Sequence, residues 1–383
     1  MAAGMSITAL PPGATIGIVG GGQLGRMSAL AAARLGYRCH ILTPEHDSPA
    51  AQVSAGVTVG AFEDPDVLRA FAGCVDLITF EFENISVRGL DLLASLRPVH
   101  PSPEVLRLSQ DRSAEKSFLN AAGAPTAAWV PVTSMADLRA AAVELGYPAI
   151  LKTTRLGYDG KGQRLLQGPE DLAPGFAALS PKPLILEGYI DFACEISVIV
   201  ARGQNGQIAC FDAVENRHRD HILNLTFAPA RIPPATAAAA RALATRVAEE
   251  IGLVGILAVE MFITENGDMK VNEIAPRPHN SGHWSIDACS ASQFEMHIRA
   301  VAGLPLPHAD RHSDAVMKNL VGPDEIALWP AIMATQGLIG HLYGKTTASP
   351  GRKMGHVTRL FSRDALPGAA GVAAALGPCF KLD

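Results

Sequence analysis

Two glutamates lie in a stretch with the pattern of a β-hairpin. Glu260 and Glu273 each sit in a hydrophobic run, and Asn266-Gly267 between the runs is typical of a two-residue turn. Such a turn, or a looser loop centred on the same residues, makes the two glutamates direct cross-strand neighbours. Carboxylates with Cβ atoms roughly 5 Å apart repel unless a cation lies between them. Mg²⁺ resolves the repulsion. A shared proton or one side chain turned to water are the alternatives, and Asn272 beside the pair favours the metal.

A lysine and a glycine-rich loop suggest a phosphate site. Residues 149–152 form a short apolar strand ending in Lys152, and a cation in a buried strand usually has an anionic partner. Residues 157–163 read Gly-Tyr-Asp-Gly-Lys-Gly-Gln. Three glycines around charged groups are typical of a flap whose N–H groups and Lys161 cover phosphates. An exposed hairpin loop has a similar composition, but Lys152 favours the phosphate interpretation.

Two further loops concentrate polar side chains. The loop after the hairpin combines a cation, two imidazoles, an amide and a hydroxyl, from Arg277, His279, His283, Asn280 and Ser281. Such density is unusual for a connection without a ligand. Residues 351–356, Gly-Arg-Lys-Met-Gly-His, form a second basic loop, which by itself is more typical of a surface turn.

The elements that position these residues begin with alternating strands and helices. An apolar run at residues 14–19 leads into a glycine turn and an Ala-rich helix. Strands at 39–42 and 75–80 and a helix at 87–96 continue the alternation. This order predicts a doubly wound, Rossmann-like unit.

The glycine turn has the spacing of a dinucleotide fingerprint, Gly20-x-Gly22-x-x-Gly25, which alone is a weak signal. A nicotinamide site also needs an acidic residue at the end of the second strand, where Thr43-Pro44 stands. A turn needed only for packing and a monophosphate site therefore remain open.

The rest of the chain predicts a mixed architecture. A single helix is expected over residues 103–122, followed from residue 149 by strands joined through glycine loops. An Ala-rich helix over 235–251 precedes the hairpin, and short mixed elements follow from about residue 304.

Composition limits the class of protein. A chain of 383 residues suggests two or three domains, and 48% hydrophobic with 18% charged residues indicates a folded protein. The net charge of -5 provides no basic footprint for nucleic acid or an anionic membrane. The six cysteines are scattered, and no apolar run reaches membrane-spanning length. We therefore expect reduced thiols in the cytoplasm and small-molecule partners.

The order of Lys152, the glycine flap, Glu260 and Glu273 resembles that of ATP-grasp enzymes. The motifs GGGQLGRM, GYDGKGQ, NEIAPRPHNSGHW and PGRKMGH are similar to those of 5-(carboxyamino)imidazole ribonucleotide synthases. The resemblance implies an α/β and α+β fold with three domains: Rossmann-like over 1–110, ATP-grasp over 111–303 and a small C-terminal domain over 304–383. It also implies a homodimer that uses ATP and Mg²⁺, with aminoimidazole ribonucleotide and bicarbonate as substrates in purine biosynthesis.

The resemblance also assigns roles to residues. It places ATP on Arg112, Lys152, Gly157, Tyr158, Asp159, Gly160, Lys161, Gly162, Gln163, Glu187, Gly188, Tyr189, Ile190, Glu195, His218, Asn272 and Glu273. It places the ribonucleotide on Gln23, Glu81, Tyr158, Asp159, Lys161, Asn280, Lys345, Arg352 and Lys353. Glu260 and Glu273 would bind Mg²⁺, and the catalytic residues would be Asp159, Arg277 and Lys353. Ser349 stands where the family often has arginine, which weakens the assignment of phosphate contacts in that loop.

Three alternatives follow from the same residues. Formate-dependent phosphoribosylglycinamide formyltransferase is the nearest other ATP-grasp ligase. A nicotinamide-dependent oxidoreductase would use the glycine turn at Gly20. A catalytically silent nucleotide-binding protein is opposed by the intact Lys152, Glu260 and Glu273.

Overall fold

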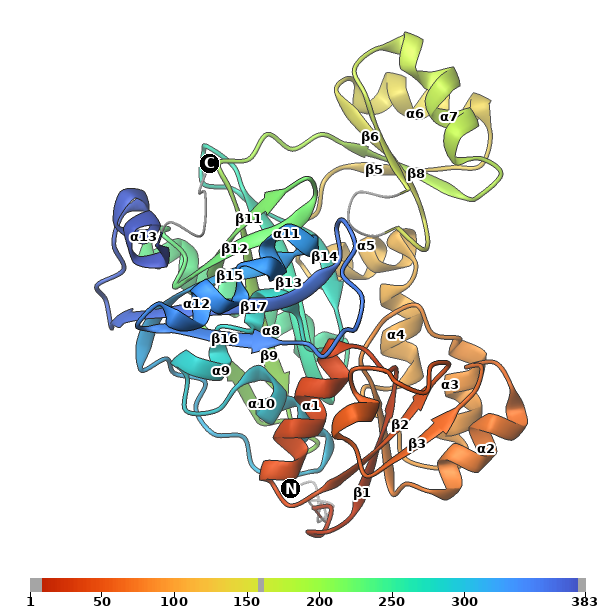
Figure 1. Cartoon of the computed structure of the whole chain (residues 1–383). Coiled ribbons are helices and arrows are strands. Elements are labelled where there is room, and N and C mark those ends of the chain that lie inside the picture. The colour runs from red at the N-terminus through yellow and green to blue at the C-terminus, as the bar shows by residue number, and fades with distance from the viewer. Residues whose placement is uncertain (1–8, 158–161, 378–383) are drawn as a thin grey trace, which may run out of the picture.

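The computed structural model describes residues 9–157 and 162–377 and contains three β-sheets (Figure 1). A parallel sheet lies in the N-terminal part, a large mixed sheet forms the centre, and a small antiparallel sheet forms a protruding lobe. The mixture of α/β and α+β architecture agrees with the fold class expected from the sequence.

The N-terminal sheet is doubly wound, as expected. Its strand order is β3-β2-β1-β4, and all pairs are parallel. Both faces of β1 are buried, which its apolar, β-branched sequence favours. The elements are β1 (Thr15–Val19), α1 (Gln23–Arg34), β2 (Arg38–Thr43), β3 (Gly56–Val59), α2 (Pro65–Gly73), β4 (Leu77–Phe80) and α3 (Val87–Ala94).

The single helix expected over residues 103–122 is wrong. The segment forms α4 (Pro103–Ser109) and α5 (Arg112–Ala121), separated by Gln110 and Asp111. Asp111 has extended backbone angles, and its side chain accepts hydrogen bonds from the N–H groups of Ser113 and Ala114. An aspartate that caps a new helix ends the preceding one, and Arg112 becomes the first residue of α5.

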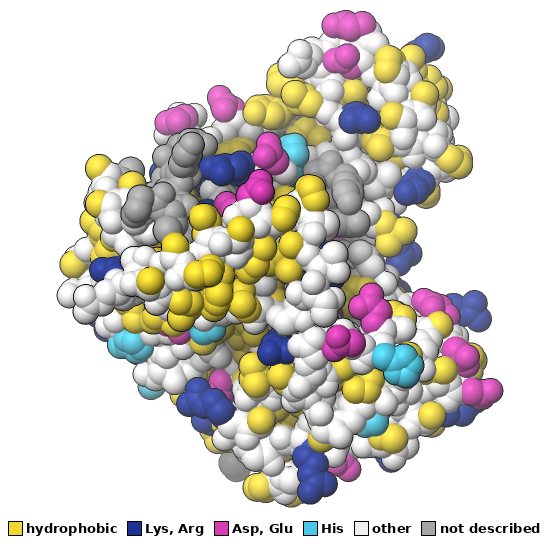
Figure 2. Space-filling view, viewed as in Figure 1, with side chains coloured by type: hydrophobic (Ala, Val, Ile, Leu, Met, Phe, Trp, Pro, Cys, Tyr) yellow, Lys and Arg dark blue, Asp and Glu magenta, His cyan; other side chains and the backbone are white. Residues whose placement is uncertain are grey.

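The protruding lobe consists of β5 (Trp129–Val132), α6 (Met135–Leu145), β6 (Ala149–Thr153), β7 (Gln163–Leu166), α7 (Leu172–Leu179) and β8 (Leu184–Gly188). Its antiparallel sheet has the order β5-β8-β6-β7. Figure 2 shows the lobe standing away from the rest of the molecule, with an indentation beneath it.

The central sheet has nine strands in the order β14-β13-β9-β11-β12-β15-β17-β16, with β10 paired to β9. The C-terminal strands thus extend the central sheet. Its strands are β9 (Cys194–Arg202), β10 (Ile208–Cys210), β11 (Val214–Arg219), β12 (Ile222–Ala228), β13 (Gly255–Ile263), β14 (Met269–Ala275), β15 (Ser313–Val321), β16 (Leu338–Leu342) and β17 (Lys353–Ser362). The helices of this part are α8 (Pro234–Glu250), α9 (Ser285–Ala288), α10 (Gln293–Val301), α11 (Gly322–Ala327), α12 (Trp329–Ala334) and α13 (Ala369–Leu376).

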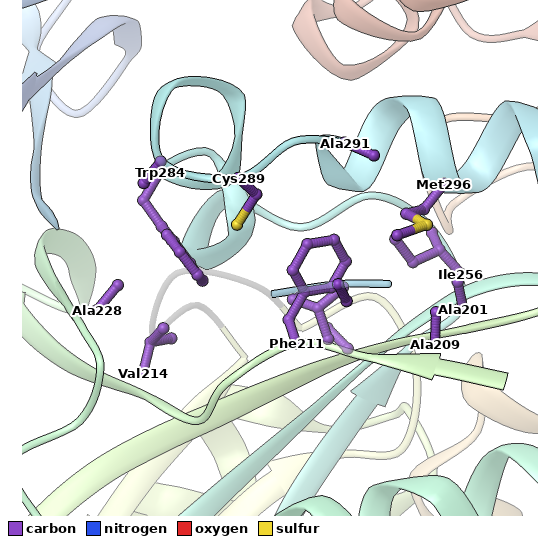
Figure 3. Close-up of a cluster of buried hydrophobic side chains, with 14 of the residues drawn as sticks. Ala201, Ala209, Phe211, Val214, Ala228, Ile256, Trp284, Cys289, Ala291 and Met296 are labelled. Atoms are coloured by element: carbon purple, nitrogen blue, oxygen red, sulfur yellow. The ribbon is translucent and has the colours of Figure 1, made fainter. Parts of the chain in front are cut away.

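The core lies on both faces of this sheet. Alternate residues of β9 face opposite sides: Ile196, Val198 and Val200 pack with α8, and Ile199 and Ala201 pack on the side of α9 and α10. Figure 3 shows the second cluster, where Phe211 and Trp284 meet edge to face at 6.3 Å between ring centroids. None of the helices in the described parts of the chain combines the length and apolar character needed to cross a bilayer.

Candidate active site

A cleft with a cavity volume of about 670 Å³ lies where the three sheets approach one another. Most of the described residues that the sequence assigned to a site line it. They are Gln23, Glu81, Arg112, Lys152, Gly157, Gln163, Glu195, His218, Glu260, Asn272, Glu273, Arg277, Asn280 and Lys353. Segments more than 300 residues apart in the sequence thus meet in one cleft.

The two glutamates face each other across β13 and β14, which confirms the pairing expected from the sequence. The reasoning about the turn was wrong in detail. Thr264 N–H bonds to Asp268 O, and Gly267 has φ +82°, so the turn is one residue longer than a two-residue turn. A bulge at Asn272 then shifts the register by one residue and restores the pairing of Glu260 with Glu273.

Each carboxylate of the pair also has a basic side chain as a neighbour. Glu260 Oε1 lies 3.1 Å from His279 Nε2, and Glu273 Oε2 lies 3.1 Å from Arg112 Nη1. Burial would raise the pKa of Glu260, but His279 and, further away, His218 and Arg277 lower it to about 2. The pair is therefore an oxygen donor set whose Glu260 is ionised at neutral pH, as a hard divalent cation requires.

Lys152 has an anionic partner within the chain. Its Nζ donates to Glu187 Oε2 at 2.9 Å, and Lys116 Nζ lies 3.3 Å from the same oxygen. All three side chains are buried. Sequence reasoning missed Lys116, although its position four residues after Arg112 places both cations on one face of α5.

A smaller pocket adjoins the cleft and shares Ile150, Lys152, Phe192, Phe262 and Asn272 with it. The four residues expected to read adenine, Glu187, Gly188, Tyr189 and Ile190, line this pocket together with Val271 and Ala127. Phe192 and Phe262 stack at its mouth with ring centroids 4.6 Å apart. Apolar walls beside backbone polar groups suit a planar base.

Glu195 and His218 form an ion pair between β9 and β11, on the wall of the same cleft. Burial would lower the pKa of His218, but its hydrogen bond to Glu195 and the charges of Glu195 and Glu260 raise the pKa above its ordinary value.

The N–H groups of the glycine turn bind the carboxyl group of Glu81. The N–H groups of Gly22 and Gly25 donate to its two carboxylate oxygens at 2.8 and 3.1 Å. A Cβ on Gly22 would come within 2.6 Å of the same carboxylate. Burial raises the pKa of Glu81, against these two bonds and the charges of Arg277 and Lys345. Glu81 therefore takes two of the N–H groups that the motif offers to a phosphate.

The remaining basic residues that the sequence assigned to the site, among those that the structure describes, are Arg277, Lys345, Arg352 and Lys353. Arg277 Nε lies 3.3 Å from Glu83 Oε1, a partner that sequence reasoning missed. Lys353 lines the cavity, whereas Lys345 and Arg352 lie outside its lining. The Lys345 ammonium donates to Lys353 O at 2.7 Å, and Arg352 Nη1 donates to Thr347 O at 2.8 Å. Burial and the charges of Arg352 and Lys353 lower the pKa of Lys345 to about 8, against the charge of Glu81.

Asn280 also lines the cavity, and its amide has neither a donor nor an acceptor partner among the described residues, although both atoms are buried. Buried polar atoms without partners are rare in proteins. We therefore infer that the Asn280 amide forms hydrogen bonds with a bound ligand.

Comparisons with known proteins agree with this arrangement. Residues 13–110 match the ribonucleotide synthetase preATP-grasp domain, 117–294 the ATP-grasp domain, and 315–365 the phosphoribosylaminoimidazole carboxylase C-terminal domain. The N5-carboxyaminoimidazole ribonucleotide synthase of Brucella melitensis is 50% identical over 361 residues, which are 94% of this chain and 99% of that protein. The chain belongs to the N5-carboxyaminoimidazole ribonucleotide synthase family. It is an ATP-grasp ligase.

Solved structures of this synthase family have the same fold. The Staphylococcus aureus enzyme complexed with ADP superposes with a TM-score of 0.89 at 40% identity, covering 94% of this chain and 96% of that one. The Aspergillus clavatus enzyme in complex with ADP and 5-aminoimidazole ribonucleotide has a TM-score of 0.86 at 32% identity, covering 91% and 94%.

Part of the synthase flap lies outside the described residues, namely Tyr158, Asp159, Gly160 and Lys161. The two ends of the flap are described. Gly157 and Gln163 line the cleft, and Gly162 has φ +75°, a conformation that favours glycine. Leu156, directly before Gly157, has φ +64°. This left-handed leucine therefore carries backbone strain at the start of the flap.

Proposed function

We propose that this chain transfers the γ-phosphoryl group of ATP to bicarbonate and then carboxylates the exocyclic amine of aminoimidazole ribonucleotide. The observation that carries the proposal is the facing pair Glu260 and Glu273, flanked by Arg112 and Lys152 in one cleft. Phosphoryl transfer needs this combination of metal-binding carboxylates and cations, because charge spreads over the phosphoryl oxygens. The match to the carboxylase C-terminal domain supports this reaction over the formate-dependent alternative.

The nucleotide would run from the small pocket into the cleft. Adenine would lie against Glu187, Gly188, Tyr189 and Ile190, and the ribose would contact Glu195. His218, Asn272, Lys152 and Arg112 would face the phosphates, with Gly157, Gly162 and Gln163 at the edges of the flap that covers them. Tyr158, Asp159, Gly160 and Lys161 would complete that flap.

Glu260 and Glu273 would hold Mg²⁺. The fit rests on two facing, partly exposed carboxylates that line the cleft together with Arg112 and Lys152. When bound, Mg²⁺ supplies positive charge that neutralises the phosphates. Glu260 and Glu273 orient that end of the nucleotide, and Arg112 and Lys152 add positive charge beside it.

Bicarbonate would bind beside Arg277, four residues after Glu273. A bicarbonate oxygen takes the γ-phosphoryl group, and ADP leaves. The carboxyphosphate formed then breaks down to CO₂ and phosphate. Because carboxyphosphate hydrolyses in water, the flap must exclude solvent during this step.

The ribonucleotide would occupy the end of the cleft at the glycine turn. Gln23, Glu81 and Asn280 would contact it from one side, and Lys345, Arg352 and Lys353 from the other, with Tyr158, Asp159 and Lys161 from the flap. Its exocyclic amine attacks CO₂ to form a carbamate, and the amine proton passes to Asp159. Since Glu81 already takes N–H groups of the glycine turn, the basic residues are better placed to hold the substrate phosphate.

An ADP-release assay tests the reaction. With bicarbonate present, we expect aminoimidazole ribonucleotide to stimulate ADP formation. Formate in place of bicarbonate is expected to give no stimulation, and labelled bicarbonate is expected to appear in the product. Absence of ribonucleotide stimulation would overturn the substrate assignment.

The organisation of the chain is proposed on the same resemblance. We infer three domains over residues 1–110, 111–303 and 304–383, assembled as a cytoplasmic homodimer. Light scattering of the purified protein measures the dimer directly, and a monomeric mass would contradict it.

A further inference from the structure

Helix α5 contacts three consecutive residues of β14. Glu115 Oε1 accepts a hydrogen bond from Ile274 N–H at 2.7 Å, and Lys116 Nζ lies 3.5 Å from the carbonyl oxygen of Asn272. Between these two residues lies Glu273, one of the proposed metal ligands. Glu115 is 1% exposed, so its carboxylate is committed to the interior.

These contacts provide hydrogen-bond acceptors for N–H groups of β14 that have no partner within the sheet. The strand is the edge of the central sheet, so every second N–H group points away from β13 and requires another partner. Val271 N–H donates to Pro125 O at 2.7 Å, and Ile274 N–H donates to Glu115. Figure 1 shows α5 beside this edge. The edge is therefore covered by α5 and the segment after it.

The covered stretch contains the bulge that sets the pairing of the carboxylates. Before Asn272 the register follows the turn, and after it the register is shifted so that Glu273 faces Glu260. Without the shift, Asn272 would stand opposite Glu260 and the facing pair would be lost. A bulge leaves its extra residue without a partner and disrupts the ladder locally. The hydrogen bond from Ile274 lies directly after the shifted position.

We propose that Glu115 is a positioning residue of the active site, which holds Ile274 and so keeps Glu273 in register with Glu260. It acts as a hydrogen-bond acceptor whose side chain is long enough to place an oxygen 2.7 Å from the Ile274 nitrogen. Arg112, on the same face of α5, meets the Glu273 side chain at 3.1 Å and depends on the same register. The inference rests on the proposed binding of Mg²⁺ and nucleotide by this pair.

Two substitutions separate the length of the side chain from its carboxyl group. Glu115→Gln keeps an oxygen at the same distance in an amide, whereas Glu115→Asp keeps the carboxyl group and withdraws the oxygen by one methylene. Ser117→Ala, on the exposed side of α5, is the matched control. The measurement is ADP binding by titration calorimetry with and without Mg²⁺, with the melting temperature of each variant recorded alongside.

We expect Mg²⁺ to raise the affinity of the wild type and of Ser117→Ala for ADP by the same factor. Glu115→Gln is expected to retain this factor within about twofold, and Glu115→Asp to lose roughly tenfold of it, the effect of one broken bond to a buried N–H group. ADP affinity without Mg²⁺ is expected to change little in either variant.

The opposite order, with Glu115→Asp unaffected and Glu115→Gln impaired, would show that the carboxyl group matters and the length of the side chain does not, and would overturn the inference. Equal behaviour of both variants and the wild type would overturn it as well. Should the Asp variant fail to fold, a Gln variant without the Mg²⁺ effect still contradicts the inference. A wild type whose ADP affinity does not respond to Mg²⁺ would instead refute the metal assignment, and this inference with it.

Discussion

Replacing Glu187 by Gln removes the negative charge that pairs with Lys152 at the junction of the proposed adenine pocket and the phosphate site. Its carboxylate lies 2.9 Å from Lys152 Nζ and 3.3 Å from Lys116 Nζ. The Glu187 side chain is 4% exposed, and those of Lys116 and Lys152 are 1% and 9% exposed. Glutamine preserves the shape of the side chain. The variant therefore leaves two ammonium groups buried without their anion.

The loss of stability in this variant can be estimated from these distances and exposures. Breaking a buried ion pair by removing one partner destabilises a protein by about 3–5 kcal/mol. The glutamine oxygen can still accept one hydrogen bond, so we expect the lower end, about 3 kcal/mol. Burial lowers the pKa of Lys152, and Glu187 opposes that shift. In the variant this pKa falls further, and part of the lysine becomes a neutral amine that binds phosphate weakly.

Two measurements check this. In urea unfolding, Glu187→Gln is expected to be less stable than the wild type near neutral pH. Burial raises the pKa of Glu187, but Lys152 and Lys116 lower it below its ordinary value. Its contribution is therefore present above that ordinary value of about 4.3 and is lost as the pH falls through the folded-state pKa, so the difference between the two proteins narrows in acid.

The second measurement is the KM for ATP between about pH 6 and about pH 9. The KM for ATP of the variant is expected to exceed that of the wild type most at high pH. As the pH falls and Lys152 takes up a proton, the two KM values are expected to approach each other. Glu144→Gln, on the exposed side of α6, is the control and is expected to match the wild type. Wild-type stability together with a wild-type KM for ATP at every pH would refute the reasoning.

Three further predictions concern the other end of the cleft and the metal. Because the pKa of Lys345 is about 8, the KM for aminoimidazole ribonucleotide is expected to rise above that pH, and Lys345→Arg to remove the rise; an unchanged profile in the arginine variant contradicts this. Glu273→Gln is expected to lose most turnover with its circular dichroism unchanged, and wild-type activity would count against the carboxylate pair. Asn280→Ala removes an amide that has no partner in the described protein, so it is expected to raise the same KM about tenfold with little change in melting temperature.

The hairpin shows which features of the fold local sequence patterns can predict. The hydrophobic runs and the Asn-Gly pair predicted the hairpin, and the pairing of Glu260 with Glu273 is confirmed. The turn is one residue longer than a two-residue turn, and the bulge at Asn272 compensates for the extra residue. Next to this bulge, Ile274 N–H donates to Glu115, which belongs to a helix more than 150 residues earlier. Hydrophobic periodicity contains no signal for such a contact.

The glycine turn was recognised, but its occupant was not. Gly20, Gly22 and Gly25 predicted a strand, a turn and a helix, and the structure has β1 and α1 there. The N–H groups of a helix start attract any anion, and the carboxylate of Glu81 at the end of the neighbouring strand is already tethered within reach. A tethered carboxyl group has a far higher local concentration than a free phosphate. Glu81 therefore binds the N–H groups of the glycine turn because its strand lies next to that turn in the sheet.

The partners of two site residues were also missed from the sequence. Motifs identify groups by type and local spacing, and they identified Lys152 and Arg277, which both line the cleft. Each is held by a carboxylate that its own motif does not contain, Glu187 for the lysine and Glu83 for the arginine. A buried cation needs an anion, so the search for ligands of such a cation should begin with carboxylates on strands that the topology places beside it. Here β8 pairs with β6, which places Glu187 opposite Ile150 and so on the same face of the sheet as Lys152, two residues along.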